Sequence, residues 1–193
     1  ICTLVAVALV FVVQTLAILL FGFNPLTYYK KAFPLLAFAF FSRSSAASIP
    51  LGVNIQTTKL GINQSIANLS SSLGATIGQV GCVGVYVTMV IFMTAAAMGQ
   101  NPWHISFILF TIFIVVVTSF GIGGIGGGAI YGALVGLAAF NYPVAMLGLL
   151  IPVEAIIDMF RTTANVNGLT VSGLLTSKIT RSNNKATFNS NKT

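Results

Sequence analysis

The chain has 193 residues, of which 56% are apolar and only two, Glu154 and Asp158, are acidic. Its mean hydropathy of +0.96 excludes an ordinary soluble domain and predicts an all-α membrane protein. The net charge of +7 comes from basic residues scattered around apolar segments, so positive-inside anchoring explains it and no nucleic-acid partner is expected. Two cysteines, Cys2 and Cys82, are too few for a disulfide framework or a metal site, and no cofactor is expected.

Residues 1–22 form the clearest apolar segment. They carry no charged side chain and, at about 1.5 Å per residue, are long enough to cross a hydrocarbon core of roughly 30 Å. A cleaved signal peptide would open with a basic leader and end at a small-residue cleavage site, which this stretch lacks. We therefore expect a transmembrane helix here, and we expect the chain, which starts at Ile1, to be part of a longer protein.

The next segment, 23–60, reads as a re-entrant hairpin. Lys30 and Lys31 place its start on the cytoplasmic side. The apolar run 32–41 has only ten residues before it meets the polar sequence SRSSAASIP at 42–50. Ten residues cannot cross a bilayer, so the chain is expected to enter the membrane and return.

Glycines interrupt both of the following segments. Residues 61–100 are expected to form a transmembrane helix broken at GQVGCVG, 78–84, since each glycine lowers helix propensity by about 1 kcal/mol. Residues 101–142 are expected to form a second re-entrant hairpin, with a short apolar arm at 103–118 and a glycine-rich tip, SFGIGGIGGGA, at 119–129. No strand precedes this tip and no Lys-Ser/Thr follows it, which excludes a nucleotide-binding loop.

Residues 143–177 form the last predicted transmembrane helix, which has a polar centre, and 178–193 a basic cytoplasmic tail. Two similar units in series, separated by one membrane crossing, have opposite orientations and form an inverted repeat. Short apolar segments interrupted by glycine in matching positions of two halves are typical of the substrate site of a secondary transporter.

Polar residues on the last helix share one stripe. They follow i, i+3 and i+4 spacing: Glu154, Asp158, Arg161, Thr162 and Asn165. A charged side chain at the bilayer centre costs about 2.5 to 3.5 kcal/mol, so these groups need partners. One interpretation is a structural ion pair between Asp158 and Arg161 that fixes the rotation of the helix. The other is that Asp158 accepts an ammonium group while the planar guanidinium of Arg161 binds a carboxylate.

The two predicted tips carry the remaining candidates. Ser44 and Ser45 lie where the return arm of the first hairpin begins, so that their hydroxyls and the free amides could hold an anion or simply cap the helix. Arg43 is expected to balance Asp158 when no substrate is bound. The glycine-rich tip suits a mobile segment whose backbone approaches a ligand, or alternatively a close helix–helix contact.

Three motifs in this order, SRSSAASIP, the glycine-rich tip and DMFRTTANVNG, resemble hairpin 1, hairpin 2 and the eighth helix of the dicarboxylate/amino acid:cation symporter family, the glutamate-transporter homologues. The resemblance covers nearly the whole chain and matches the C-terminal half of the family. It implies a multi-pass protein of the bacterial cytoplasmic membrane that works by elevator-type alternating access. It also implies a homotrimer formed through N-terminal scaffold helices.

The resemblance also implies roles for individual residues. Asp158 would bind the amino group of the substrate and Arg161 a distal carboxylate. The residues that it assigns to substrate binding are Arg43, Ser44, Ser45, Cys82, Gly124, Ile125, Gly126, Asp158, Arg161, Thr162 and Asn165. The residues whose backbone carbonyls it assigns to ion binding are Gly74, Gly78, Ser119, Phe120, Ile122 and Asn165.

Departures from the family pattern bear on the cargo and the coupling ion. Val80 stands where relatives that carry glutamate or aspartate have the Asp of NMDGT, and Leu169 stands where a second sodium-binding Asp is expected. The GQxGC version resembles the L-cystine uptake branch, so L-cystine is the expected substrate, coupled to sodium or to protons. A dicarboxylate or a neutral amino acid is the alternative cargo. A non-transporting or channel-like membrane fragment is the alternative of another class.

Overall fold

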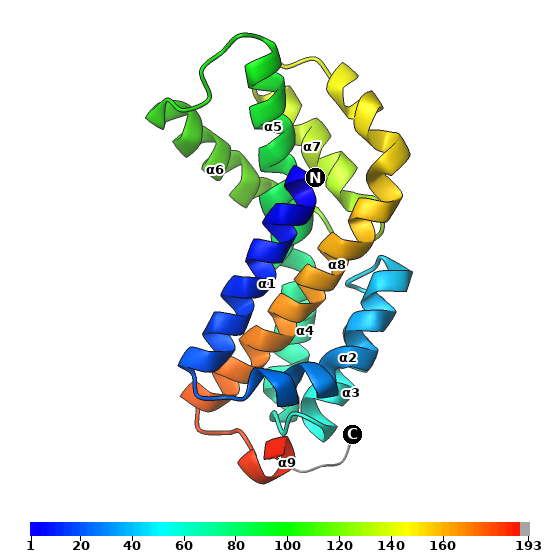
Figure 1. Ribbon diagram of the computed structural model, residues 1–193, viewed down its shortest axis with the longest axis vertical. Coiled ribbons are helices and arrows are strands. Elements are labelled where there is room, and N and C mark those ends of the chain that lie inside the picture. The colour runs from blue at the N-terminus through cyan, green and yellow to red at the C-terminus, as the bar shows by residue number, and fades with distance from the viewer. Residues whose placement is uncertain (190–193) are drawn as a thin grey trace.

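The computed structural model describes residues 1–189, and helices account for most of them (Figure 1). In chain order these are α1 (Cys2–Leu20), α2 (Pro25–Ser42), α3 (Ile49–Thr58), α4 (Gln64–Ile77), the π-helix η1 (Val80–Val85), α5 (Tyr86–Ala97), α6 (Ile105–Gly121), α7 (Gly128–Ala139), α8 (Ala145–Ile179) and α9 (Lys185–Asn189). No residue between 1 and 189 lies in a β-strand. The predicted all-α class is therefore confirmed.

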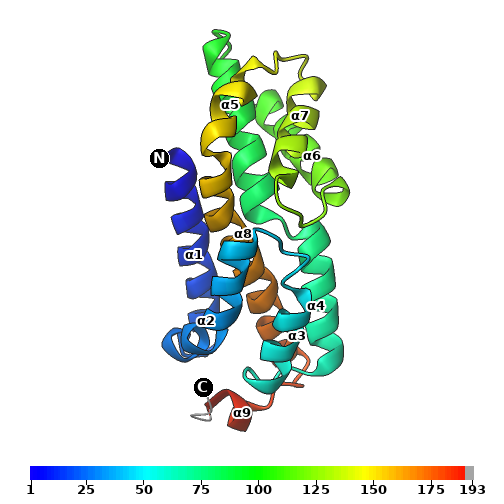
Figure 2. The same ribbon diagram turned by 90° about the vertical axis from the view of Figure 1, so that its right-hand side faces the viewer.

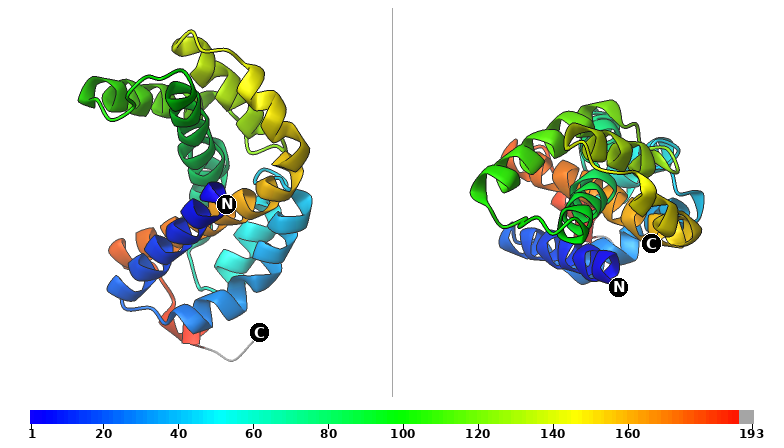
Figure 3. Two further views of the ribbon diagram at one scale, coloured as in Figure 1. Left: turned by 45° about the horizontal axis from the view of Figure 1, so that its top comes forward. Right: turned by 90° about the horizontal axis from the view of Figure 1, so that it is seen from above.

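The molecule is elongated, and α8 connects two groups of helices at its opposite ends (Figures 1 and 2). One hydrophobic cluster is built from α1 to α4, the C-terminal half of α8 and α9, around residues such as Leu35 and Leu174. A second cluster is built from η1, α5, α7 and the start of α8, around Val87 and Leu137. Figure 3 shows that α8 changes direction between the two groups. The middle of α8 therefore lies where the groups meet.

Among residues 1–189, two helical stretches are apolar and long enough to cross a membrane, judged by length and composition: α1 and the run Gln64–Ala97, which comprises α4, η1 and α5. Helix α1 packs on the flank of α8 and leaves apolar side chains such as Leu9 and Val13 exposed along its outer face. Helix α8 has 35 residues but carries buried charged side chains.

Helices α2 and α3 form the first helical hairpin. Asn24 caps α2 by accepting a hydrogen bond from the amide of Leu26 at 2.9 Å, and Pro25 occupies the first turn, where its missing N–H costs nothing. The helix ends at Ser42, and Arg43 turns the chain with a left-handed φ of +54°. The tip that follows lies against the middle of α8 (Figure 2).

The predicted interruption between residues 78 and 84 takes a specific form. Helix α4 ends at Ile77, Gly78 and Gln79 leave the helical path, and the chain resumes as the π-helix η1. A Cβ atom at Gly81 would lie 2.7 Å from the carbonyl oxygen of Arg161, which is shorter than any normal contact. The glycine therefore allows the backbone of η1 to touch the backbone of α8.

The second helical hairpin differs from the sequence prediction at its tip. The apolar arm was predicted to end at residue 118, with the tip at 119–129, but α6 continues to Gly121 and α7 begins at Gly128. The last turn of α6 is held against the end of α4, because the Ser119 hydroxyl donates a hydrogen bond to the carbonyl of Ile77 at 2.8 Å. The tip is therefore limited to residues 122–127.

The basic tail is docked rather than extended. Phe188 of α9 is 3% exposed and packs against Phe23, with ring centroids 4.9 Å apart. The buried Nζ of Lys31 donates hydrogen bonds to the carbonyls of Lys59 at 2.9 Å and Thr187 at 2.8 Å. The tail thus closes the end of the first helical hairpin, and the part of the predicted tail at 190–193 lies outside the described residues.

The contact between η1 and α8 predicts different effects for substitutions at two glycines that are three residues apart. Gly81→Ala should lower the thermal unfolding midpoint of the intact protein in detergent by about 4 °C or more, because the new methyl group meets the backbone of α8. Gly84→Ala is the matched control, since its Cβ would have only Val80 nearby, at 3.9 Å. An equal loss of stability in both variants would contradict the packing described here.

The docked tail predicts a second effect. Lys31→Met should increase the rate of trypsin cleavage after Arg181 or Lys185 by about tenfold, because two carbonyls lose a charged donor. The rate is followed by mass spectrometry of the released peptides. The control is Lys30→Met, since Lys30 is exposed. Similar cleavage rates in the two variants would show that Lys31 does not hold the tail.

Candidate functional site

The middle of α8 carries a buried polar stripe. Glu154, Asp158, Arg161, Thr162 and Asn165 are each at most 5% exposed, and they follow the helical spacing that the sequence predicted. Glu154 and Asp158 are the only acidic residues of the chain. Both acidic side chains therefore lie on two turns of one helix, almost completely shielded from solvent.

Arg161 is enclosed by anions and an aromatic ring. Its Nη1 donates to Oε2 of Glu154 at 3.3 Å, its Nη2 contacts the other carboxylate oxygen of Glu154, and Nη2 also lies 3.3 Å from Oδ1 of Asp158. The guanidinium carbon lies 4.2 Å from the ring centroid of Tyr86. This pairing matters because an ion left alone after its buried partner is removed costs about 3 to 5 kcal/mol.

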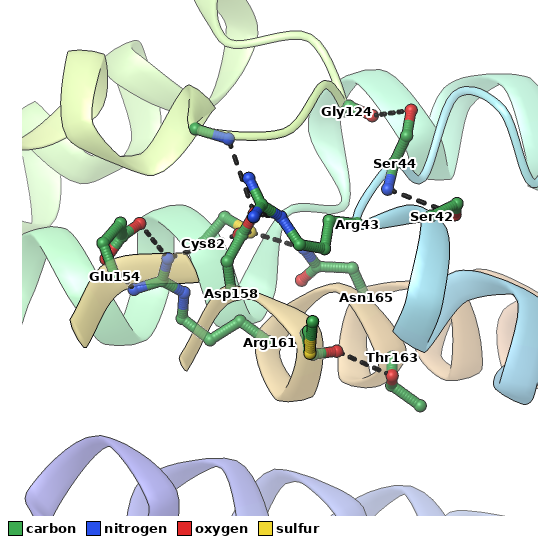
Figure 4. Close-up of polar contacts among 12 residues, drawn as sticks. Ser42, Arg43, Ser44, Cys82, Gly124, Glu154, Asp158, Arg161, Thr163 and Asn165 are labelled. Atoms are coloured by element: carbon green, nitrogen blue, oxygen red, sulfur yellow. Dashed lines mark hydrogen bonds and ion pairs between the residues drawn. The ribbon is translucent and has the colours of Figure 1, made fainter. Parts of the chain in front are cut away.

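Asp158 is the point where four elements converge (Figure 4). Its Oδ2 lies 3.4 Å from Nε of Arg43 and accepts a hydrogen bond from the amide of Gly127, also at 3.4 Å. Its Oδ1 contacts Arg161 and accepts from the thiol of Cys82 at 3.8 Å. The tip of each helical hairpin, the π-helix and α8 thus all contribute a group to one carboxylate.

The ion pair expected between Arg43 and Asp158 is present. The side chain of Arg43 is 34% exposed, whereas that of Asp158 is 2% exposed. Arg43 is therefore the member of the pair that solvent reaches, and it covers Asp158 on that side. Arg43 and Arg161 supply two positive charges, and Asp158 and Glu154 supply two negative charges, so the cluster is neutral.

Asn165 connects the stripe to the interrupted helix. Its Nδ2 donates to Oε1 of Gln79 at 2.8 Å and to the sulfur of Cys82 at 3.0 Å, while its Oδ1 accepts from the amide of Gly81 at 2.7 Å. These bonds satisfy backbone and side-chain groups that the helix interruption would otherwise leave unpaired.

The two hairpin tips meet at one carbonyl group. The oxygen of Gly124 accepts hydrogen bonds from the Ser44 hydroxyl at 3.0 Å and from the amide of Ala46 at 2.9 Å. A Cβ atom at Gly124 would lie 2.7 Å from Cβ of Ser45, so only glycine allows this approach. Ser45 itself is 2% exposed.

The structure brings the predicted substrate-binding residues together, except for the side chain of Ile125. Gly126 lies beside Arg43, since a Cβ there would be 3.4 Å from the Arg43 carbonyl. Ile125 is 61% exposed, so its side chain is not enclosed with the others. Thr162 is buried one turn after Asp158 on the same stripe.

The predicted ion-binding carbonyls are already partly engaged. The carbonyl of Gly74 accepts from the amide of Gly78 at 3.0 Å, and that of Gly78 accepts from the amide of Val80 at 2.9 Å. Ser119 is brought to the end of α4 by its hydroxyl, whereas Phe120 is 68% exposed. Ile122 is buried in the second hydrophobic cluster. Within residues 1–189 no group of three or more His, Cys, Asp or Glu side chains could hold a metal ion.

Three contacts in the site were not predicted from the sequence. Glu154 was placed on the stripe, but its pairing with Arg161 was not, although a spacing of seven residues puts the two on one helix face. Gln79 and Tyr86 were not predicted either. Both lie in or directly after the glycine-rich interruption, and apolar periodicity says nothing about which of its side chains turn inward.

Known proteins resemble this chain along most of its length. The model of the sodium:dicarboxylate symporter family matches residues 1–179. The L-cystine uptake protein TcyP of Bacillus licheniformis is 49% identical over 183 residues, which are 95% of this chain and 40% of that protein. An uncharacterized symporter of Haemophilus influenzae is 50% identical over 174 residues, or 90% and 40% of the two chains. The TcyP protein of Shouchella clausii is 48% identical over 184 residues, or 95% and 39%.

The chain thus spans about 40% of the length of these curated relatives. Because the family model matches far more than half of its residues, the chain belongs to the sodium:dicarboxylate symporter family, whose members are membrane transporters and not enzymes.

Proposed function

We propose that this chain is the substrate-binding part of a cation-coupled symporter that takes up L-cystine or a related amino acid across the cytoplasmic membrane of a bacterium. The observation that carries the proposal is the position of Asp158. This buried carboxylate contacts both hairpin tips, the π-helix η1 and Arg161. A cationic group that binds to it would therefore change the contacts of all four elements. The names of the relatives support L-cystine as the cargo.

The ammonium group of the substrate replaces Arg43 on Asp158. Arg43 is the solvent-exposed partner, and its departure leaves a carboxylate that needs a new positive charge. Arg161 then binds a distal carboxylate, while Cys82, Thr162 and Asn165 line the pocket. The serines at residues 44 and 45 form the first-hairpin side of the site, and residues 124–126 form its gate.

The two helical hairpins are re-entrant and belong to an inverted repeat. Their tips approach the middle of α8 from opposite ends of the molecule (Figure 2), which is the arrangement that two oppositely oriented units would produce. Helix α8 has 35 residues, about 52 Å, so a hydrocarbon core of roughly 30 Å would enclose its central turns. The charged stripe would then lie near the membrane midplane.

The whole protein works as an elevator within a homotrimer. The part of the relatives that this chain does not cover would supply the scaffold helices, and the helices described here would move against them. The exposed apolar face of α1 is compatible with burial in lipid or against such helices.

The coupling ion is sodium or a proton. Carbonyl groups around residues 74, 78, 119, 120, 122 and 165 would hold sodium. Two features weaken that site, namely the apolar side chains of Val80 and Leu169. Leu169 packs directly onto Gly74, so that it fills the space beside one of the carbonyl groups with hydrocarbon.

A dicarboxylate or a neutral amino acid is the second candidate cargo, because the family takes its name from dicarboxylates. Competition for uptake among L-cystine, aspartate and serine separates these candidates. Exchange of labelled for unlabelled substrate across the membrane separates a carrier from a channel-like or inert protein.

Substitution of the central carboxylate tests the proposal. Asp158→Asn should reduce L-cystine binding by the intact protein at least about a hundredfold, because the amide cannot compensate an ammonium group in a site sheltered from water. Binding is measured by isothermal titration calorimetry on protein in detergent. The thermal unfolding midpoint of the variant shows that it is folded, and unchanged affinity in a folded variant would remove Asp158 from the substrate site.

Separate ion gradients identify the coupling ion. We expect L-cystine uptake into proteoliposomes to be driven by an inward proton gradient or an inward sodium gradient, whereas a potassium gradient of equal size without a membrane potential should drive none. Replacement of Leu169 by Asp should increase any sodium dependence, since it adds a carboxylate beside Gly74. Uptake that needs no ion gradient would contradict coupled transport.

A further inference from the structure

Glu154 has no role in the substrate contacts proposed so far. It is 5% exposed, and both of its carboxylate oxygens accept hydrogen bonds from Arg161. If Arg161 received only the carboxylate of an acidic side chain, Glu154 would compete with that carboxylate for the same guanidinium nitrogens. The two negative groups would also repel each other at short range, where little water screens them.

A buried polar atom of this pair has no hydrogen-bond partner. Within residues 1–189, the Nε atom of Arg161 is inaccessible to solvent and makes no hydrogen bond. Tyr86 is 1% exposed, and its ring lies over the guanidinium of Arg161. Unpaired buried polar groups are rare and destabilising, so one of them on this ion pair indicates a place where a polar ligand group is received.

The charge balance limits which ligand fits. The cluster of Arg43, Asp158, Arg161 and Glu154 is neutral. An acidic amino acid would add a net negative charge to it. L-cystine is neutral as a whole, and each of its two ends carries one ammonium and one carboxylate group.

We infer that Glu154 and Arg161 together receive the distal amino-acid end of the substrate, with Glu154 binding the second ammonium group and Arg161 the second carboxylate. The ion pair between Glu154 and Arg161 opens, and the ammonium and carboxylate groups of the ligand bind between the two side chains. The Arg161 Nε gains a partner in the same step. Glu154 is thus a specificity-determining residue, and this inference rests on the proposed function.

A positioning role is the competing account of Glu154. In that case it only orients Arg161, and its loss weakens every ligand that has a distal carboxylate. Ligands that differ by one charged group distinguish the two roles. The useful series is L-cystine, the mixed disulfide of L-cysteine with 3-mercaptopropionate, which lacks the distal ammonium, and the mixed disulfide of L-cysteine with cysteamine, which lacks the distal carboxylate.

The test measures the affinities of these three ligands for the intact protein and for two carboxylate-to-amide variants. The wild-type protein should prefer L-cystine over the ligand without a distal ammonium by about tenfold or more. Glu154→Gln should reduce this preference to about one, mainly by weakening L-cystine. Asp158→Asn is the matched control and should weaken all three ligands, since each retains the proximal ammonium.

Each outcome decides the matter. A wild-type protein without the preference overturns the inference, and that measurement needs no variant. A folded Glu154→Gln variant that keeps the preference overturns it as well and leaves Glu154 with a positioning role. If the wild-type protein binds none of the three disulfides but binds aspartate or serine, the proposed L-cystine function fails and the inference fails with it.

Discussion

The arrangement of the whole chain depends on three buried charges around the middle of α8, Glu154, Asp158 and Arg161, and on the partly exposed Arg43 that pairs with them. Ionised side chains away from water are tolerated only when each has a partner of opposite sign. Arg43, Asp158, Arg161 and Glu154 satisfy this requirement as two pairs of opposite charge, Arg43 with Asp158 and Arg161 with Glu154, and a contact between Arg161 and Asp158 joins the two pairs. Because Arg43 belongs to the first hairpin tip, that tip must reach α8. The backbone amide of Gly127 draws the second tip to the same carboxylate.

Much of this arrangement could be predicted from residue spacing. The polar stripe on α8, the two helical hairpins and the interruption near residue 78 follow from periodicity, the short length of apolar runs and the glycines. The pairing of Arg43 with Asp158 also follows, since the charge on the first tip needs a partner of opposite sign. These predictions succeed because they depend on which residue types a helix or an apolar environment accepts, and that information is local.

Other features depend on contacts between distant segments and could not be predicted in the same way. The last turn of α6 is bonded through Ser119 to the end of α4, a partner 42 residues away. The docked tail accepts a hydrogen bond from the ammonium group of Lys31 at the carbonyl of Thr187. The preference of Arg161 for Glu154 depends on rotamers, which the stripe alone does not determine. The proposed roles in substrate and ion binding depend further on the resemblance to the family, and only the experiments described above test them.

The Gly124 carbonyl, which accepts two hydrogen bonds from the first hairpin tip, has a consequence for leakage. Two such bonds together favour the joined tips by about 2 kcal/mol, which corresponds to a population ratio of about thirty to one. If the two tips are the gate of the proposed transporter, this gate would be closed most of the time, even without substrate. The leak of ions through open molecules would then be small, and the ion gradient that drives uptake would be conserved.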